Sequence, residues 1–161
     1  MSDPIEHILR ELLENIGVPY KDISRNEVVG QVIYSIESPE AGHALIGYHS
    51  DAIHALDHIV KKIVEKKSVG ADGVVRDRED RALFLVDVNN HRTQQIRDIE
   101  AKALMMAERA RSFQYDVELS PMSAYERLIV HSALQNAPNV KTESQGEGKT
   151  RRVVIKYSSE V

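Results

Sequence analysis

An arginine and a histidine near the expected start of a helix form the most informative pattern in the sequence. Arg127 and His131 lie four residues apart, so on a helix they share one face. Ser123, followed three residues later by Glu126, is typical of a capping box and predicts that the helix begins just before this pair. A helix start offers unpaired N–H donors and the positive end of the helix dipole, and an arginine adds a planar fork for phosphate oxygens. The pattern therefore predicts a phosphate site, although Arg-x-x-x-His alone also occurs on solvated helix faces.

A basic, glycine-containing segment follows this helix and leads into a predicted strand. We expect segments 140–142 and 151–157 to pair around the turn Gly146-Glu147-Gly148. The residues of this segment selected as nucleic-acid ligands, in addition to Ser123, Arg127 and His131, are Ser144, Gly146, Gly148, Lys149, Arg151 and Arg152. An ordinary hairpin turn with solvated cations is the alternative interpretation.

The two segments together resemble a known domain. Pro-Met-Ser-Ala-x-Glu-Arg-x-x-x-His at 121–131, followed by Ser-x-Gly-x-Gly and a basic pair, resembles the single-stranded nucleic-acid-binding domain named for its Arg-x-x-x-His signature. The version it resembles is that of the bacterial Jag family, also called KhpB or SpoIIIJ-associated protein, in which this domain follows a KH domain. The resemblance implies non-catalytic binding of single-stranded RNA, or of DNA. It also implies post-transcriptional control linked to cell elongation or division, with a small KH-only protein as partner.

The first half of the chain shows the element order of a type II KH domain. Apolar residues from Ile5 to Ile16 recur at three- and four-residue steps, which predicts an amphipathic helix. The elements expected after it are strands near 20–28 and 30–37, a helical run over 41–67 interrupted around Gly47, a polar loop over 68–80 and a strand over 83–88. We therefore predict a KH-like domain over 1–90.

The loop that would contact nucleic acid in this KH-like domain is unusual. KH loops read Gly-x-x-Gly, often with basic residues between, because glycine lets the protein backbone approach the nucleic-acid backbone. Here the tetrad is Gly47-Tyr48-His49-Ser50, and Asp51 follows it. The second glycine and the basic residues are absent, and the carboxylate repels phosphate. These four residues are candidate ligands, and a protein-interaction adaptor whose KH unit no longer binds RNA is an alternative function.

Other side chains that could do chemistry lack the companions they need. His54 and His58 lie one helical turn apart beside acidic residues, a spacing that suits a metal, but the sequence specifies no third ligand. We therefore expect no metal and no cofactor. The Glu126, Arg127 and His131 cluster leaves a hydrolase acting on nucleic acid as a further alternative, yet no nucleophile completes such a site. We expect a binding protein and not an enzyme.

Length and composition set the frame for these expectations. The chain has 161 residues, 42% of them apolar, and no cysteine, which suits a packed domain pair in a reducing interior. It shows neither a span-length apolar run nor a signal-peptide pattern, so we expect a cytoplasmic protein. The net charge is −4, with −6 over residues 1–91 and +2 over 92–161, so a polyanion should prefer the second half.

The second half should form its own α+β module over 91–161. The apolar residues expected to form the buried stripe of its long first helix are Ile96, Ile99, Ala103, Met106, Ala110 and Phe113. A strand over 115–119, the helix that carries Arg127 and the hairpin complete the module. The overall expectation is an α+β protein of two small modules, with helices packed on a small sheet in the second.

Overall fold

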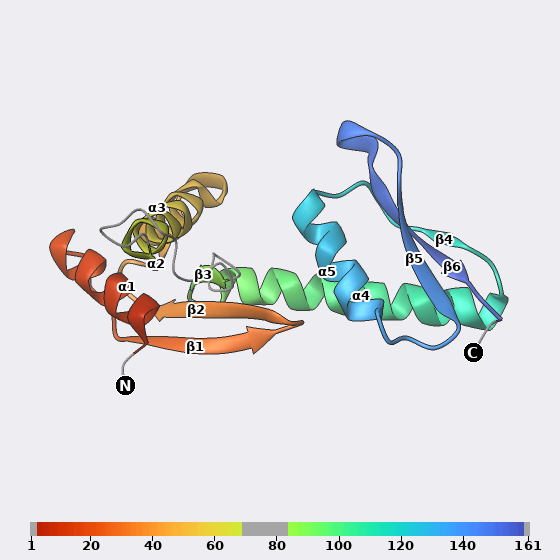
Figure 1. The fold of residues 1–161 in the computed structure, drawn as a ribbon, viewed down its shortest axis with the longest axis horizontal. Coiled ribbons are helices and arrows are strands. Elements are labelled where there is room, and N and C mark those ends of the chain that lie inside the picture. The colour runs from red at the N-terminus through yellow and green to blue at the C-terminus, as the bar shows by residue number, and fades with distance from the viewer. Residues whose placement is uncertain (1–2, 69–83, 160–161) are drawn as a thin grey trace. The chain divides into compact units, whose positions relative to one another are not determined.

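The computed structural model describes residues 3–68 and 84–159. The chain divides into two compact units, Met1–Thr93 and Gln94–Val161. Each unit combines helices with one three-stranded sheet, so the expected α+β class with two small modules is confirmed (Figure 1). None of the described helices contains a stretch long and apolar enough to cross a membrane.

The first unit follows the predicted order of helix, strand, strand, helix, helix and strand. Its elements are α1 (Pro4–Asn15), β1 (Asp22–Val28), β2 (Gln31–Glu37), α2 (Gly42–Ile46), the 3₁₀ turn η1 (Tyr48–Ser50), α3 (Asp51–Ser68) and β3 (Phe84–Val88). Most of the polar loop expected over 68–80 lies outside the described residues. Assignment of this unit to the KH type stays a prediction.

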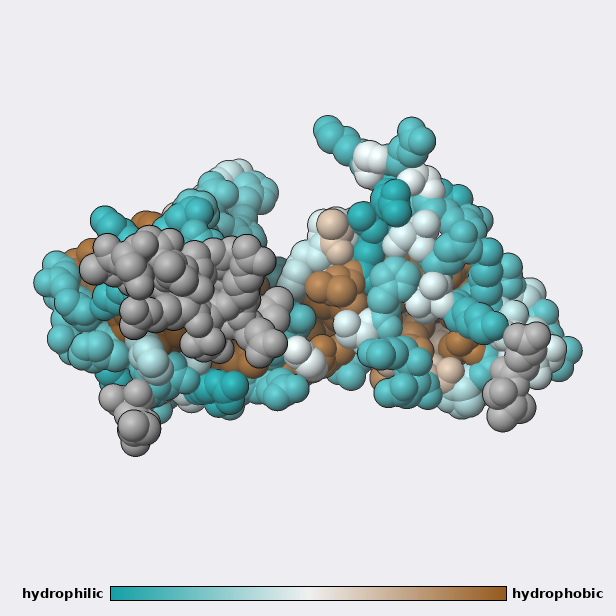
Figure 2. All heavy atoms as spheres, in the orientation of Figure 1, coloured by the Kyte–Doolittle hydropathy of each residue, from teal (hydrophilic) through white to brown (hydrophobic). Residues whose placement is uncertain are grey.

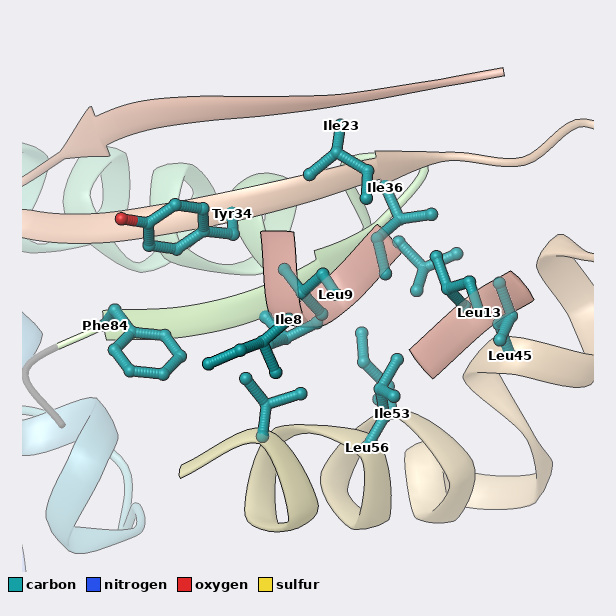
Figure 3. Close-up of a cluster of buried hydrophobic side chains, with 13 residues drawn as sticks. Ile8, Leu9, Leu13, Ile23, Tyr34, Ile36, Leu45, Ile53, Leu56 and Phe84 are labelled. Carbon is teal, nitrogen blue, oxygen red and sulfur yellow. The ribbon is translucent and has the colours of Figure 1, made fainter. Parts of the chain in front are cut away.

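Strand β2 is the centre of the first sheet. It pairs with β1 in antiparallel register and with β3 in parallel register, giving the order β1-β2-β3. Helices α1 and α3 place apolar side chains such as Leu9 and Ile53 against one face of this sheet, and both side chains are fully buried (Figure 3). Helix α1 begins where the Asp3 carboxylate accepts the Ile5 N–H, and Asp3 also accepts the Tyr34 hydroxyl from the sheet at 2.6 Å.

A buried carboxylate sets the start of the next helix, α4 (His91–Phe113). Asp87, the fourth residue of β3, is fully buried. Its two oxygens accept the backbone N–H groups of Arg92 and Thr93, at 2.8 and 3.0 Å, and the Thr93 hydroxyl at 2.7 Å. The carboxylate thereby satisfies donors that the first turn of a helix leaves unpaired.

The second unit begins within α4 and ends with an antiparallel hairpin. Its further elements are β4 (Val117–Glu118), α5 (Ala124–Leu134), β5 (Val140–Gln145), the 3₁₀ turn η2 (Gly148–Thr150) and β6 (Arg152–Tyr157). The sheet order is β4-β6-β5, and the hairpin register runs from Val140 opposite Tyr157 to Gln145 opposite Arg152.

The core of the second unit uses small residues on α4. Ala103, Ala107 and Ala110 are fully buried against apolar residues of α5 and of the sheet. Alanines let the backbone of a helix approach its neighbours closely, which suits a thin layer of two helices on three strands. The expectation that Phe113 ends the buried stripe is wrong, because 68% of this residue is exposed. It stands at the last residue of α4, one turn beyond the alanines.

Candidate nucleic-acid interface

The N-terminus of α5 is fixed by the capping box that the sequence predicts. The Ser123 hydroxyl accepts the Glu126 backbone N–H at 3.3 Å, and the Glu126 carboxylate accepts the Ser123 N–H at 2.7 Å. Both interactions satisfy backbone donors at the helix start, and the acidic side chain complements the positive end of the dipole. Ser123 therefore has a structural role that is independent of any ligand.

Arg127 is held across the segment that precedes its own helix. One Nη1–H donates to the Met122 carbonyl oxygen at 2.8 Å, and the side chain is partly buried. The bond uses one of five N–H donors of the guanidinium, so the group is oriented while the rest of its fork can still bind an anion. The Met122 N–H in turn donates to the Arg151 carbonyl oxygen at 3.2 Å. The backbone of Met122 thus links Arg127 to the base of the hairpin loop.

His131 is held between two hydroxyl groups of β5. Its Nδ1 atom lies 2.7 Å from Thr142 Oγ1, and its Nε2 atom lies 2.9 Å from Ser144 Oγ. Partial burial lowers the pKa of His131, and the nearby Arg127 charge lowers it further. The ring is therefore neutral at pH 7, and a neutral imidazole donates one hydrogen bond and accepts the other. One hydroxyl receives the ring N–H and keeps its own hydrogen, and the other donates to the ring.

This arrangement changes the role that the sequence suggests for His131. We expect from the sequence that His131 contacts phosphate directly, but both of its ring nitrogens are engaged by the hydroxyl groups. Ser144, which is among the predicted ligands, lies beside the histidine, and Thr142 joins it although sequence reasoning misses it. Alternation along a strand is the signal that could have found Thr142, because residues two apart share a face.

The loop between β5 and β6 carries exposed cations on a glycine framework. Gly146 has a φ of +88°, and a Cβ there would lie 3.1 Å from the Thr150 carbonyl oxygen, so this position favours glycine on two grounds. Lys149 and Arg151 are exposed on this loop. The hairpin end extends beyond the rest of the unit and is hydrophilic, seen as teal and white at the top of Figure 2.

Arg152 differs from the other basic residues of this segment. It is the first residue of β6, it is partly buried, and its Nε donates to the Glu118 carboxylate at 2.7 Å. A cation paired with a carboxylate attracts phosphate less than an unpaired one does. Among the predicted ligands, Arg152 therefore has the weakest case for direct contact.

The loop of the first unit adopts a backbone that usually belongs to glycine. Gly47 has a φ of +76°, and a Cβ there would lie 2.7 Å from the Cβ of Ala52. His49 and Ser50 also have positive φ, at 49° and 65°. The Ser50 hydroxyl lies 3.0 Å from His91 Nε2, which holds the strained turn, and Tyr48 is 81% exposed. The fold keeps the left-handed conformation although the second glycine is absent.

The histidine pair on α3 has a different role from the one its spacing suggests. Arg92 Nη2 donates to His54 Nδ1, and Arg92 Nη1 lies 3.3 Å from an Asp57 oxygen. Asp57 also accepts the Val86 N–H at 2.9 Å and the Lys61 ammonium at 2.8 Å. His54 thus belongs to an ion-pair network. Within residues 3–68 and 84–159, no group of three or more histidine, aspartate or glutamate side chains is arranged to hold a metal.

Comparison with known proteins supports the family resemblance. Residues 95–157 match the family model of the R-three-H domain, which is the domain named for its Arg-x-x-x-His signature. RNA-binding protein KhpB of Clostridium symbiosum is 29% identical over 138 residues, which cover 86% of this chain and 57% of that protein. RNA-binding protein KhpB of Bacillus subtilis (strain 168) is 26% identical over 160 residues, covering 96% of this chain and 71% of the relative. The chain belongs to the Jag/KhpB family.

The family match and the geometry meet at α5 and the hairpin. The match to the Arg-x-x-x-His domain ends at the last residue of β6, so it includes Arg127, His131, both β5 hydroxyls and the basic loop. The chain spans 57% of the length of the first of these KhpB relatives. The choice of the residues that touch nucleic acid therefore rests on the geometry of this chain.

Proposed function

We propose that this protein binds single-stranded nucleic acid, RNA in preference to DNA, without cleaving it. The interface comprises Arg127, the Ser144 hydroxyl, the start of α5 at Ser123 and the loop from Gly146 to Arg151. Two relatives named RNA-binding protein KhpB and the match to the Arg-x-x-x-His domain support the class of ligand. The net charge of +2 over residues 92–161 supports the choice of the second unit as the binding surface.

One observation carries the proposal: the imidazole of His131 holds Ser144 Oγ at 2.9 Å on the helix face that also presents Arg127. A phosphate at this position would meet a guanidinium fork and a hydroxyl whose orientation is already fixed. Preorganised donors bind an anion with less ordering entropy than flexible ones do. The exposed loop cations Lys149 and Arg151 extend the same positive surface along a strand of nucleic acid.

The same geometry supports binding without catalysis. A general base needs a ring nitrogen within hydrogen-bond reach of the proton it removes. Both nitrogens of His131 are engaged by Thr142 and Ser144, and Glu126 is used by the capping box. Labelled single-stranded RNA and DNA should stay intact after prolonged incubation with the pure protein and magnesium, manganese or zinc. Cleavage that disappears in a His131→Ala variant would favour the hydrolase alternative.

The wider role follows from the resemblance to the Jag/KhpB family. We place the protein in the cytoplasm, in post-transcriptional control linked to cell elongation or division, with a small KH-only protein as partner. Crosslinking in cells, followed by sequencing of the bound nucleic acid, tests the central part of this role. We expect RNA with the wild-type protein and a loss of most of it with Arg127→Ala.

A protein-interaction adaptor is the second candidate, and the first unit motivates it. Its nucleic-acid loop ends in Ser50 and Asp51, so it lacks basic residues and begins α3 with a carboxylate. Under this alternative, crosslinking would recover protein partners and no RNA above the level of a mock sample. Recovery of RNA that depends on Arg127 would reject it.

A further inference from the structure

A cavity of about 150 Å³ lies in the second unit between α4, α5 and the segment that joins β4 to α5. Apolar side chains such as Ile99, Leu119 and Val130 form its walls, and Lys102 and Glu126 supply polar groups. We infer that this cavity receives the base ring of the nucleotide whose phosphate Arg127 binds, with pyrimidines preferred over purines. The inference rests on the proposed function, because it assigns the base that belongs to the proposed phosphate contact.

The position of the cavity ties it to the phosphate site. Met122 lines the cavity, and its carbonyl oxygen accepts the Arg127 guanidinium at 2.8 Å. Glu126 also lines the cavity and precedes Arg127 directly on α5. One residue of backbone therefore separates the group that would hold a phosphate from the wall of the cavity, so both can serve a single nucleotide.

The size of the cavity favours a single ring. An apolar cavity of about 150 Å³ is large enough to hold benzene. A pyrimidine is a six-membered ring of the same class, whereas the fused rings of a purine need more room. Burial of a base face against aliphatic walls replaces water on both surfaces, as stacking platforms do in other single-strand binders.

The two polar residues match the edge of a pyrimidine. Glu126 uses Oε2 to accept the Ser123 N–H, and its second carboxylate oxygen can accept a hydrogen bond from a ligand. The Lys102 ammonium is a donor. Cytosine presents an amino donor next to a ring-nitrogen acceptor, and uracil presents an N–H donor next to a carbonyl acceptor. Each can therefore donate to Glu126 while it accepts from Lys102.

Equilibrium titration with four oligomers of equal length tests the inference: oligo(U), oligo(C), oligo(A) and an abasic ribose-phosphate strand. We expect the wild-type protein to bind oligo(U) and oligo(C) about tenfold more tightly than oligo(A), and the abasic strand most weakly. Ser120 is exposed and lines the cavity, so Ser120→Phe should plug it. The matched control is Ser112→Phe, at an exposed position of α4 outside the cavity lining.

The plugged variant should lose the pyrimidine preference and bind oligo(U) and oligo(A) within about twofold of each other, while its affinity for the abasic strand is unchanged. Lys102→Met keeps the aliphatic stem and removes the donor, so it should reduce the preference independently if Ser120→Phe fails to fold. Equal binding of all base-containing oligomers by the wild type, or unchanged preference in both variants, would overturn the inference. Arg127→Ala lowers affinity for every oligomer, the abasic strand included, if the proposed phosphate site is right. Failure of that effect, in contrast, would count against the proposed function itself.

Discussion

The Nε2 atom of His131 on α5 lies 2.9 Å from the Oγ atom of Ser144 on β5. This contact joins the helix that carries Arg127 to the hairpin that carries the basic loop. We therefore expect Ser144→Ala to weaken binding of single-stranded RNA by about 1 kcal/mol, roughly fivefold, because a hydroxyl donor is lost and the imidazole loses a partner. Ser144→Thr keeps the hydroxyl and is the control. Equal affinity of the alanine variant and the wild type in fluorescence anisotropy would show that this hydroxyl does not touch the ligand.

The lowered pKa of His131 gives the folded protein a defined dependence on pH. In the unfolded chain the imidazole titrates near its ordinary value of about 6.5, and in the folded protein it titrates below that value. Between the two values the unfolded chain binds more protons, so the contribution of His131 to stability is present above about pH 6.5 and is lost as the pH falls. The melting temperature of the wild type should therefore fall more on acidification than that of His131→Gln. A parallel fall in both proteins would contradict the assignment.

Binding should show the opposite trend with pH. A bound phosphate stabilises the protonated imidazole, so affinity for RNA should rise modestly as the pH falls, and it should rise less in His131→Gln. Titrations at several pH values and constant ionic strength measure this difference. Since stability and affinity change in opposite directions, a general loss of folding cannot imitate the result.

The loop of the first unit should be secondary for binding. We expect the double change Ser50→Gly and Asp51→Lys to leave RNA affinity unchanged or to raise it. Glycine suits the φ of 65° at position 50, and the new lysine replaces a repulsive carboxylate at the start of α3. The cost is the Ser50 contact to His91, which Ser50→Gly alone measures. Abolished binding in a folded double variant would show that the native loop makes essential contacts.

Asp87 should be among the most sensitive positions for stability. Asp87→Ala leaves the N–H groups of Arg92 and Thr93 without the carboxylate that accepts them, in a fully buried place. We expect a loss of about 3 kcal/mol in the free energy of unfolding measured by urea titration. Asp98→Ala, at an exposed position on α4, should cost less than about 0.5 kcal/mol. Similar losses in both variants would refute the capping role of Asp87.

Local sequence signals predicted much of this structure. The start of α5 follows from Ser123 and Glu126, because a capping box joins residues only three apart. The element order of the first unit follows from the periods of its apolar residues. The bond between His131 and Thr142 could not be predicted in the same way, since it depends on how β5 packs beside α5. The exposure of Phe113 was missed because periodicity shows which residues share a face but not where the opposing core ends.

The network around Asp87 was also beyond the sequence. An aspartate near the end of a buried strand is compatible with a helix cap, a loop or a ligand site. Only the backbone turn between β3 and α4 places its two oxygens against the donors of Arg92 and Thr93. The partner of His54 is Arg92, 38 residues later, so spacing on α3 alone suggested a metal instead.

The salt dependence of RNA binding by Arg127→Ala is the most direct test of the proposed interface. Each phosphate contact on a single strand contributes about 0.7 to the slope of log K against log salt concentration. The variant should bind all single-stranded sequences more weakly, and its slope should be shallower by about that amount. Arg97→Ala, at an exposed position on α4, should keep both the affinity and the slope of the wild type. Unchanged affinity and an unchanged slope in folded Arg127→Ala would contradict the account.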